Sequence, residues 1–127
     1  MIHRLYRAWI IAEKRMVRVT EIRFMDDELH SISDEKHNHY LADEIILIES
    51  TGVKDKHGVN IFDGDIITYE IRGIVYSHIV QYKGKTGCYG FDTLAIGSPS
   101  QIEFEIIGNI YENLDWRSLV NKYGGIK

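Results

Sequence analysis

The stretch Ser50–Glu70, STGVKDKHGVNIFDGDIITYE, holds two turn signals within one short length of chain. Asp55 and Gly58 take the first and last positions of a predicted type I turn, where the Asp side chain accepts hydrogen bonds from the turn backbone and Gly tolerates the exit geometry. Asp63-Gly64-Asp65 supplies a second reversal, and an apolar run typical of a β-strand begins at Ile66. The stretch therefore predicts a connector that folds back twice and starts a strand. It specifies architecture and carries no motif of a particular chemistry.

Composition indicates a small globular protein. The chain has 127 residues, 44% of them apolar and 27% charged, which suits one domain or two small β units that share a core. The single cysteine, Cys88, cannot form an internal disulfide, so we expect a protein of a reducing cytoplasm. No segment approaches the ~20 apolar residues of a membrane span, and we expect no membrane partner. The formal charge of −4 argues against a surface coated in positive charge for duplex DNA.

Charge is unevenly distributed along the first half of the chain. Residues 1–23 are rich in Arg and Lys, whereas residues 26–49 are rich in Asp and Glu. The two segments either neutralise each other locally as exposed pairs or form a bipolar surface for self-assembly or for an anionic partner.

Residues 1–49 are predicted to form an N-terminal β region. His3–Ile11 and Met16–Phe24 are two apolar runs separated by a polar reversal, as in a hairpin. Met25–Tyr40 is acidic, with few apolar anchors, and is predicted to be a long mobile loop. Glu44–Glu49 is a short, continuously apolar run that indicates a buried strand.

Residues 50–112 are predicted to form a small SH3-like antiparallel barrel, because short strands recur at close spacing between tight turns. In the last strand, Ile102, Phe104 and Ile106 alternate with outward-facing glutamates, and Ile107-Gly108 breaks the alternation, which indicates a β-bulge. The period changes in residues 113–127, which predict a short C-terminal helix. Its apolar face consists of Trp116, Leu119, Val120 and Tyr123.

Three blocks of the sequence together resemble the YopX family of small phage and prophage proteins. They are Tyr6-Arg7-Ala8-Trp9, residues 50–58 with 61–66, and residues 107–113. Ile10 stands where the family usually has an acidic residue, and the helical extension from Leu114 to Lys127 has no counterpart in the family pattern. The resemblance implies a mainly β protein with an SH3-like barrel in its second half, encoded by phages or prophages and present in the bacterial host cell. It implies no reaction and supplies no catalytic positions.

Several residue groups have the chemistry of a site but also a simpler structural explanation. His37 and His39, with Asp34 and Glu35, could bind zinc, yet no further ligand pair stands at recognisable spacing, and a solvated loop explains them. The pairs Asp63/Asp65 and Glu103/Glu105 suit a turn and the outer face of a strand, and Cys88 has no partner pattern of a nucleophile. We therefore predict no catalytic residue, metal or cofactor, and no enzymatic activity. A hydrolase that uses the acidic loop through Asp34 is the alternative.

Binding is the function that this composition favours. A candidate binding surface combines aromatic and basic residues, which suit stacking and phosphate contact: Arg72, Tyr82, Lys83, Lys85 and Tyr89. The aromatics could equally fill a core and its rim. We predict a non-enzymatic accessory protein that binds a phage or host protein, itself included as a homo-oligomer through Trp116, Leu119, Val120 and Tyr123. Single-stranded nucleic-acid binding in phage replication or regulation is the alternative.

Overall fold

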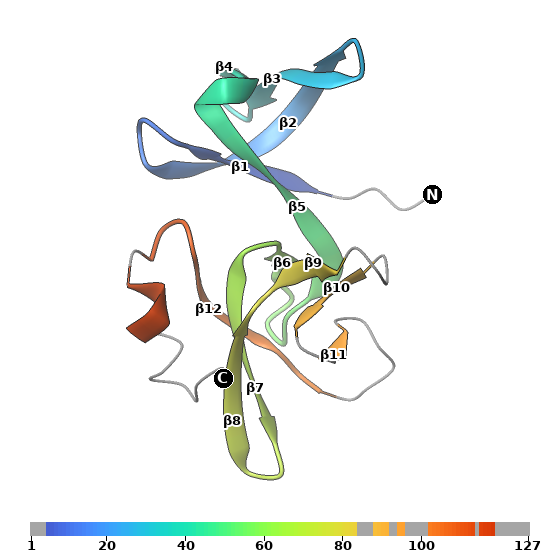
Figure 1. Ribbon diagram of the computed structural model, residues 1–127, viewed down its shortest axis with the longest axis vertical. Coiled ribbons are helices and arrows are strands. Elements are labelled where there is room, and N and C mark those ends of the chain that lie inside the picture. The colour runs from blue at the N-terminus through green and yellow to red at the C-terminus, as the bar shows by residue number, and fades with distance from the viewer. Residues whose placement is uncertain (1–4, 84–87, 92–93, 96–101, 114, 119–127) are drawn as a thin grey trace. The chain divides into compact units, whose positions relative to one another are not determined.

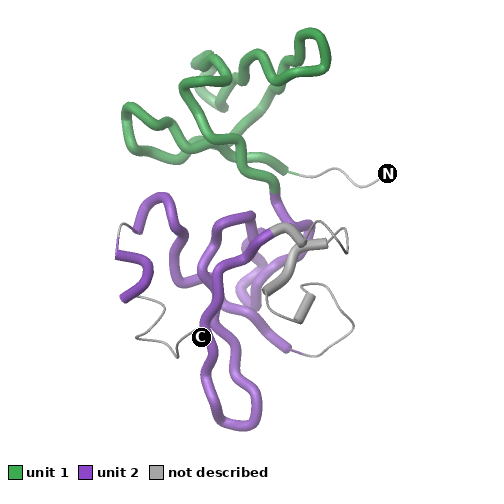
Figure 2. The backbone as a smooth tube through the Cα atoms, viewed as in Figure 1, with its two compact units in different colours: residues 1–49 green, residues 50–127 purple. Residues whose placement is uncertain are grey.

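The computed structural model describes residues 5–83, 88–91, 94–95, 102–113 and 115–118. The chain is mainly β and divides into two compact units, residues 1–49 and 50–127 (Figure 2). The part of the chain that the structure describes includes no helix with the length and hydropathy needed to cross a bilayer.

Unit 1 is an antiparallel sheet with the strand order β4-β3-β2-β1-β5 (Figure 1). Its elements are β1 (Tyr6–Ile10), β2 (Arg15–Met25), β3 (Glu28–Asp34), β4 (His39–Leu41), the 3-10 turn η1 (Ala42–Glu44) and the first half of β5 (Ile45–Lys54). The predicted N-terminal hairpin is confirmed, since β1 pairs with β2 from Arg7↔Arg18 to Ile10↔Arg15. The predicted strand after the acidic segment is also confirmed, as β5.

The core of unit 1 lies on one face of this sheet. Its buried members are Ala8, Ile10, Val17, Ile32, Tyr40 and Ile45. In β3 and β4 the pairing of Ile32 with Tyr40, and of Ile22 in β2 with Ile32, places three apolar side chains in one row toward this core. Alternation in a strand then places their neighbours on the opposite face.

The prediction of a long mobile loop over Met25–Tyr40 is wrong. This segment forms β3 and most of β4, and it buries Ser31, Ser33 and Asp34 together with Ile32. The polar composition misled the prediction because these polar groups are buried with hydrogen-bond partners. The Asp34 carboxylate, for example, accepts hydrogen bonds from the backbone of Lys36 and Asn38, both at 2.9 Å.

Unit 2 contains the second half of β5 and the remaining strands. They are β6 (Asn60–Phe62), β7 (Asp65–Ile71), β8 (Ile74–Ile79), β9 (Gln81–Lys83), β10 (Cys88–Phe91), β11 (Leu94–Ala95) and β12 (Glu105–Asn109). β5 pairs with β6 through Ser50↔Phe62 and Lys54↔Asn60. The other strands form two three-stranded antiparallel sheets, β12-β7-β8 and β11-β10-β9. The core of the unit contains Ile61, Ile67, Tyr69, Val80 and Phe104.

The two turns of Ser50–Glu70 form where the sequence predicts them. Gly58 N donates to Asp55 O at 3.0 Å, which closes the first turn, and Gly58 has φ +81°. Gly64 has φ +86°, and a Cβ there would lie 2.8 Å from Tyr111 Cε2. Glycine is therefore required at position 64 by both conformation and space.

The SH3-like barrel is confirmed only as a mainly β, antiparallel unit, because the described strands form no closed barrel. The pairing of β12 with β7 shifts between Ile106 and Gly108, which confirms the predicted bulge. Phe104 is buried and Ile102 and Ile106 pack against the core, as the alternation predicts, although β12 begins only at Glu105. Of the predicted C-terminal helix, one turn at residues 116–118 is described.

Candidate functional site

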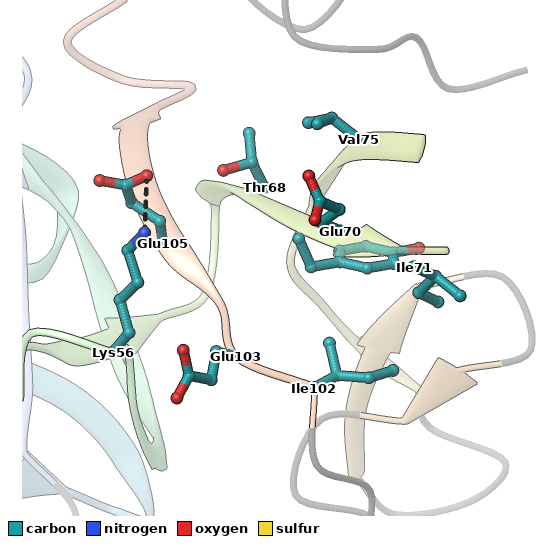
Figure 3. A pocket seen from close by; sticks show the side chains of 9 residues that line it. Lys56, Thr68, Glu70, Ile71, Val75, Ile102, Glu103 and Glu105 are labelled. Carbon is teal, nitrogen blue, oxygen red and sulfur yellow. Dashed lines mark ion pairs between the residues drawn. The ribbon is translucent and has the colours of Figure 1, made fainter. Parts of the chain in front are cut away.

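The candidate site is an open pocket of about 710 Å³ in unit 2. Its lining comes from the first turn, from β7 and β8, and from the segment that leads into β12. The lining residues are Lys56, Thr68, Tyr69, Glu70, Ile71, Val75, Ile102, Glu103 and Glu105. In Figure 3, Lys56, Glu103 and Glu105 stand on one side of the pocket and Glu70, Ile71 and Val75 on the other.

The β7–β8 hairpin supplies the apolar wall. Arg72 and Gly73 both have positive φ, +52° and +82°, a conformation that matches the twist of a two-residue hairpin loop. The register Glu70↔Val75 and Ile71↔Ile74 then extends the two strands to the loop. Ile71, Ile74 and Val75 are 37%, 56% and 42% exposed. These three partly exposed aliphatic side chains form an apolar surface at the end of the hairpin that a partner could cover.

Tyr69 lines the pocket from the core side. It is 8% exposed, and its ring stacks on Tyr76 and His78 at centroid distances of 5.4 and 5.7 Å and meets Phe104 edge-on at 5.7 Å. The ring is therefore held in one position by aromatic neighbours from β8 and from the segment before β12.

The opposite wall is charged. Lys56 Nζ lies 3.5 Å from Glu105 Oε1, and His57 Nε2 donates to Glu105 Oε2 at 3.3 Å. The hydrogen bond from His57 and the charge of Lys56 hold the pKa of Glu105 below its usual value. The backbone also fixes this wall, because Lys56 N donates to Phe104 O at 2.8 Å.

The lining carries three carboxylates and one ammonium group. Because Lys56 pairs with Glu105, Glu70 and Glu103 give the pocket a negative potential beside its apolar wall. Such a lining favours a cationic group carried on an aliphatic stem, as in Lys or Arg. The nine lining residues include no Ser, Cys or His, and the described residues hold no group of three or more His, Cys, Asp or Glu arranged to bind a metal ion.

The structure brings together only part of the predicted binding surface. Arg72 is exposed at the tip of the β7–β8 hairpin. Tyr82 in β9 pairs in backbone register with Tyr89 in β10, and Lys83 pairs with Cys88. Lys85 lies outside the described residues.

Of the predicted self-association residues, only Trp116 is described. Its ring lies 4.6 Å from Arg117 Cζ, within cation–π range. Leu119, Val120 and Tyr123 lie outside the described part of the chain.

Several other residues weighed from sequence have structural contacts or line the pocket. Asp65 Oδ2 accepts a hydrogen bond from Phe62 N at 2.8 Å, as expected for a turn aspartate. Glu103 and Glu105 both line the pocket. The Asp34 carboxylate accepts hydrogen bonds from the backbone amides of Lys36 and Asn38. His39 contacts Arg23 and Ser33.

Sequence reasoning missed Glu70 and the apolar hairpin end. The signal was present: Ile71, Ile74 and Val75 flank a turn that needs no apolar residue for folding. Lys56, Glu70 and Glu103 are far apart in the chain, so only the folded unit places them around one pocket.

One solved structure is similar over nearly the whole chain. The crystal structure of protein EF1440 from Enterococcus faecalis matches with a TM-score of 0.73 and 26% identity, and the match covers 91% of this chain and 99% of that one. No curated protein matches. The family model described as YopX protein matches residues 5–115, and the chain therefore belongs to the YopX family.

Proposed function

We propose that this YopX-family protein is a non-enzymatic phage or prophage accessory protein that binds another protein through the pocket of unit 2, in the cytoplasm of the bacterial host. The observation that carries the proposal is the pairing of an exposed aliphatic hairpin end with an excess of carboxylates around one pocket. Exposed aliphatic side chains gain from burial by a partner, at about 25 cal/mol per Å².

The proposed occupant is a peptide segment in which a Lys or Arg adjoins an aliphatic residue. Its cation lies between Glu70 and Glu103, next to the Tyr69 ring, and its aliphatic neighbour packs on Ile71 and Val75. A cationic ligand also competes with Lys56 for Glu105. The negative lining opposes a nucleic-acid backbone at the same place.

A displayed library of random peptides, selected on the full chain, tests this proposal. We expect the enriched sequences to carry Lys or Arg beside aliphatic residues, and their binding to weaken as salt rises. The double variant Glu70→Gln/Glu103→Gln should lose at least about tenfold in affinity, since it removes two charge contacts. Glu35→Gln, an exposed glutamate of unit 1, is the matched control and should bind as the wild type does. Enrichment of acidic peptides, or equal binding by the double variant, contradicts the proposal.

Self-association is part of the same proposal. Trp116 is half-buried beside Arg117 in the helical turn and belongs to the apolar set that the sequence indicates. Light scattering of the wild type should give a mass above that of one chain. The mass measured for Trp116→Ala should be closer to that of a monomer. A monomer at every accessible concentration removes this part and leaves the peptide site standing.

Single-stranded nucleic-acid binding is the second candidate. It is favoured by the cross-strand pair Tyr82↔Tyr89, next to Lys83 and near in sequence to the exposed Arg72. A labelled oligonucleotide should then bind with an affinity that falls as salt rises, and Tyr89→Ala should weaken it. Binding that is absent at low salt excludes this function.

A further inference from the structure

A polar cluster lies on the face of the unit 1 sheet opposite its core. Arg23 pairs with Ser31 between β2 and β3, and Ser33 pairs with His39 between β3 and β4. Since the neighbouring row with Ile32 faces the core, alternation places these four polar residues on the other face.

The cluster is closely connected. Arg23 Nη2 donates to Ser33 Oγ and lies 2.7 Å from His39 Nδ1, and Ser33 Oγ lies 3.0 Å from the same Nδ1. Ser31 Oγ contacts His30 Nδ1 at 3.1 Å. Ser33 and Ser31 are only 3% and 7% exposed.

These groups have more donors than acceptors. An unprotonated Nδ1 of His39 has one lone pair, which accepts from either Arg23 or Ser33, so the other of these two donors has no acceptor on that atom. Arg23 Nη1 is buried and has no hydrogen-bond partner within the described chain. When His39 is neutral and accepts at Nδ1, its Nε2–H is a further donor.

The charge of Arg23 is also weakly compensated. Neither of its two close partners, Ser33 and His39, carries a negative charge. The carboxylate of Glu21 lies 3.8 Å from Arg23 Nη2, but the Glu21 side chain is 68% exposed. An exposed ion pair of this kind contributes little, and a half-buried guanidinium among neutral groups attracts a further anion.

We propose that Arg23, Ser33 and His39 form a binding site for a small oxyanion of the phosphate class. Phosphate oxygens accept from the guanidinium and from the imidazole Nε2–H, and hydrogen bonds that involve a charged group are stronger than those between neutral groups. When Arg23 turns to the anion, the Ser33 hydroxyl donates its one hydrogen to His39 Nδ1 and so orients the imidazole. The anion takes the place of Glu21 as the counterion of Arg23. This site lies in unit 1 and does not depend on the pocket of unit 2.

An NMR titration of the full chain with inorganic phosphate tests the proposal, with potassium chloride at equal ionic strength as the reference. We expect saturable amide shifts at residues 22–23, 31–33 and 39. Arg23→Gln should weaken binding by about tenfold or more, because a charge-assisted contact is lost. Arg18→Gln, an exposed arginine on the same strand, should bind as the wild type does.

Arg23→Lys separates charge from geometry. It keeps the cation but loses the planar fork, so we expect affinity between that of the wild type and that of Arg23→Gln. If Arg23→Gln fails to fold, the residues that shift in the wild type and the phosphate affinity of Arg23→Lys test the proposal instead. Shifts that do not saturate, or that spread over other basic residues of unit 1, overturn the proposal.

Discussion

Removing the Asp55 carboxylate should strongly destabilise unit 2. Asp55 is 8% exposed, and its Oδ1 accepts hydrogen bonds from His57 N and Val59 N, both at 2.9 Å. Its Oδ2 reaches Ile106 N at 3.4 Å, which ties the turn to β12. One side chain therefore closes the turn and attaches it to a strand about fifty positions later in the chain.

The magnitude follows from the number of bonds lost. A hydrogen bond to a charged group contributes about 1.5–3 kcal/mol, so Asp55→Ala, which leaves two short bonds unmade, should lower the free energy of unfolding by about 3–5 kcal/mol. Asp55→Asn keeps an oxygen for His57 and Val59 but turns an amide N–H toward Ile106 N–H. We expect a loss of about 1–2 kcal/mol for Asp55→Asn.

Urea unfolding followed by circular dichroism measures both losses, and amide exchange at Val59 reports the turn itself. Asp115→Asn, at an exposed position, is the control and should change stability by less than about 0.5 kcal/mol. If Asp55→Ala loses less than about 1 kcal/mol, the reasoning that this carboxylate closes unit 2 is refuted.

Acid should reproduce part of the effect. Burial acts to raise the pKa of Asp55, but hydrogen bonds from Val59, His57 and Ile106 outweigh it and hold the pKa below its usual value. A carboxyl whose pKa is lower in the folded state contributes stability above its unfolded pKa, and this contribution is lost as pH falls through the folded pKa. The unfolding free energy of the wild type should therefore fall in acid more steeply than that of Asp55→Asn.

Three further predictions concern single positions. Gly64→Ala should lower the free energy of unfolding by about 2–4 kcal/mol, because φ is +86° and the new Cβ would lie 2.8 Å from Tyr111. Gly73→Ala, with φ +82° but open space around it, should lower it by only about 1 kcal/mol. Thermal unfolding compares the two variants, and equal losses would show that the contact with Tyr111 is irrelevant. Asp34→Asn should flatten the acid dependence of unit 1, because burial raises the pKa of Asp34 but hydrogen bonds from Asn38 and Lys36 lower it further, below its usual value. Ile32→Ala, at a position with 0% exposure, should cost about 2–5 kcal/mol in urea unfolding, and a smaller loss would place it outside the core.

Unit 1 shows where sequence reasoning failed. Ser31, Ser33 and Asp34 are polar and were predicted in a loop, yet they are buried in β3. Ser33 contacts Arg23 on β2 and His39 on β4, Asp34 accepts from a backbone amide in the turn after β3, and Ser31 contacts the adjacent His30. A polar residue is predicted to be exposed unless its hydrogen-bond partner is known, and the partners of Ser33 lie on the neighbouring strands β2 and β4.

The candidate site shows the same limit. The aromatic and basic residues chosen from sequence share a stretch of chain, whereas the pocket joins Lys56, Glu70 and Glu103, which only the fold of unit 2 brings together. The family resemblance is confirmed over residues 5–115, but it transfers no functional residue to this chain.

The sequence by itself determined the turns at Asp55–Gly58 and around Gly64, the N-terminal hairpin and the bulge before Gly108. Each depends on backbone conformation and on contacts within a few residues, so the residue types there are sufficient. The tertiary structure alone decided the burial of the β3 serines, the Arg23 cluster and the acidic pocket. Those features depend on charges and hydrogen bonds between strands, and their energies are set by burial and distance, which no local pattern contains.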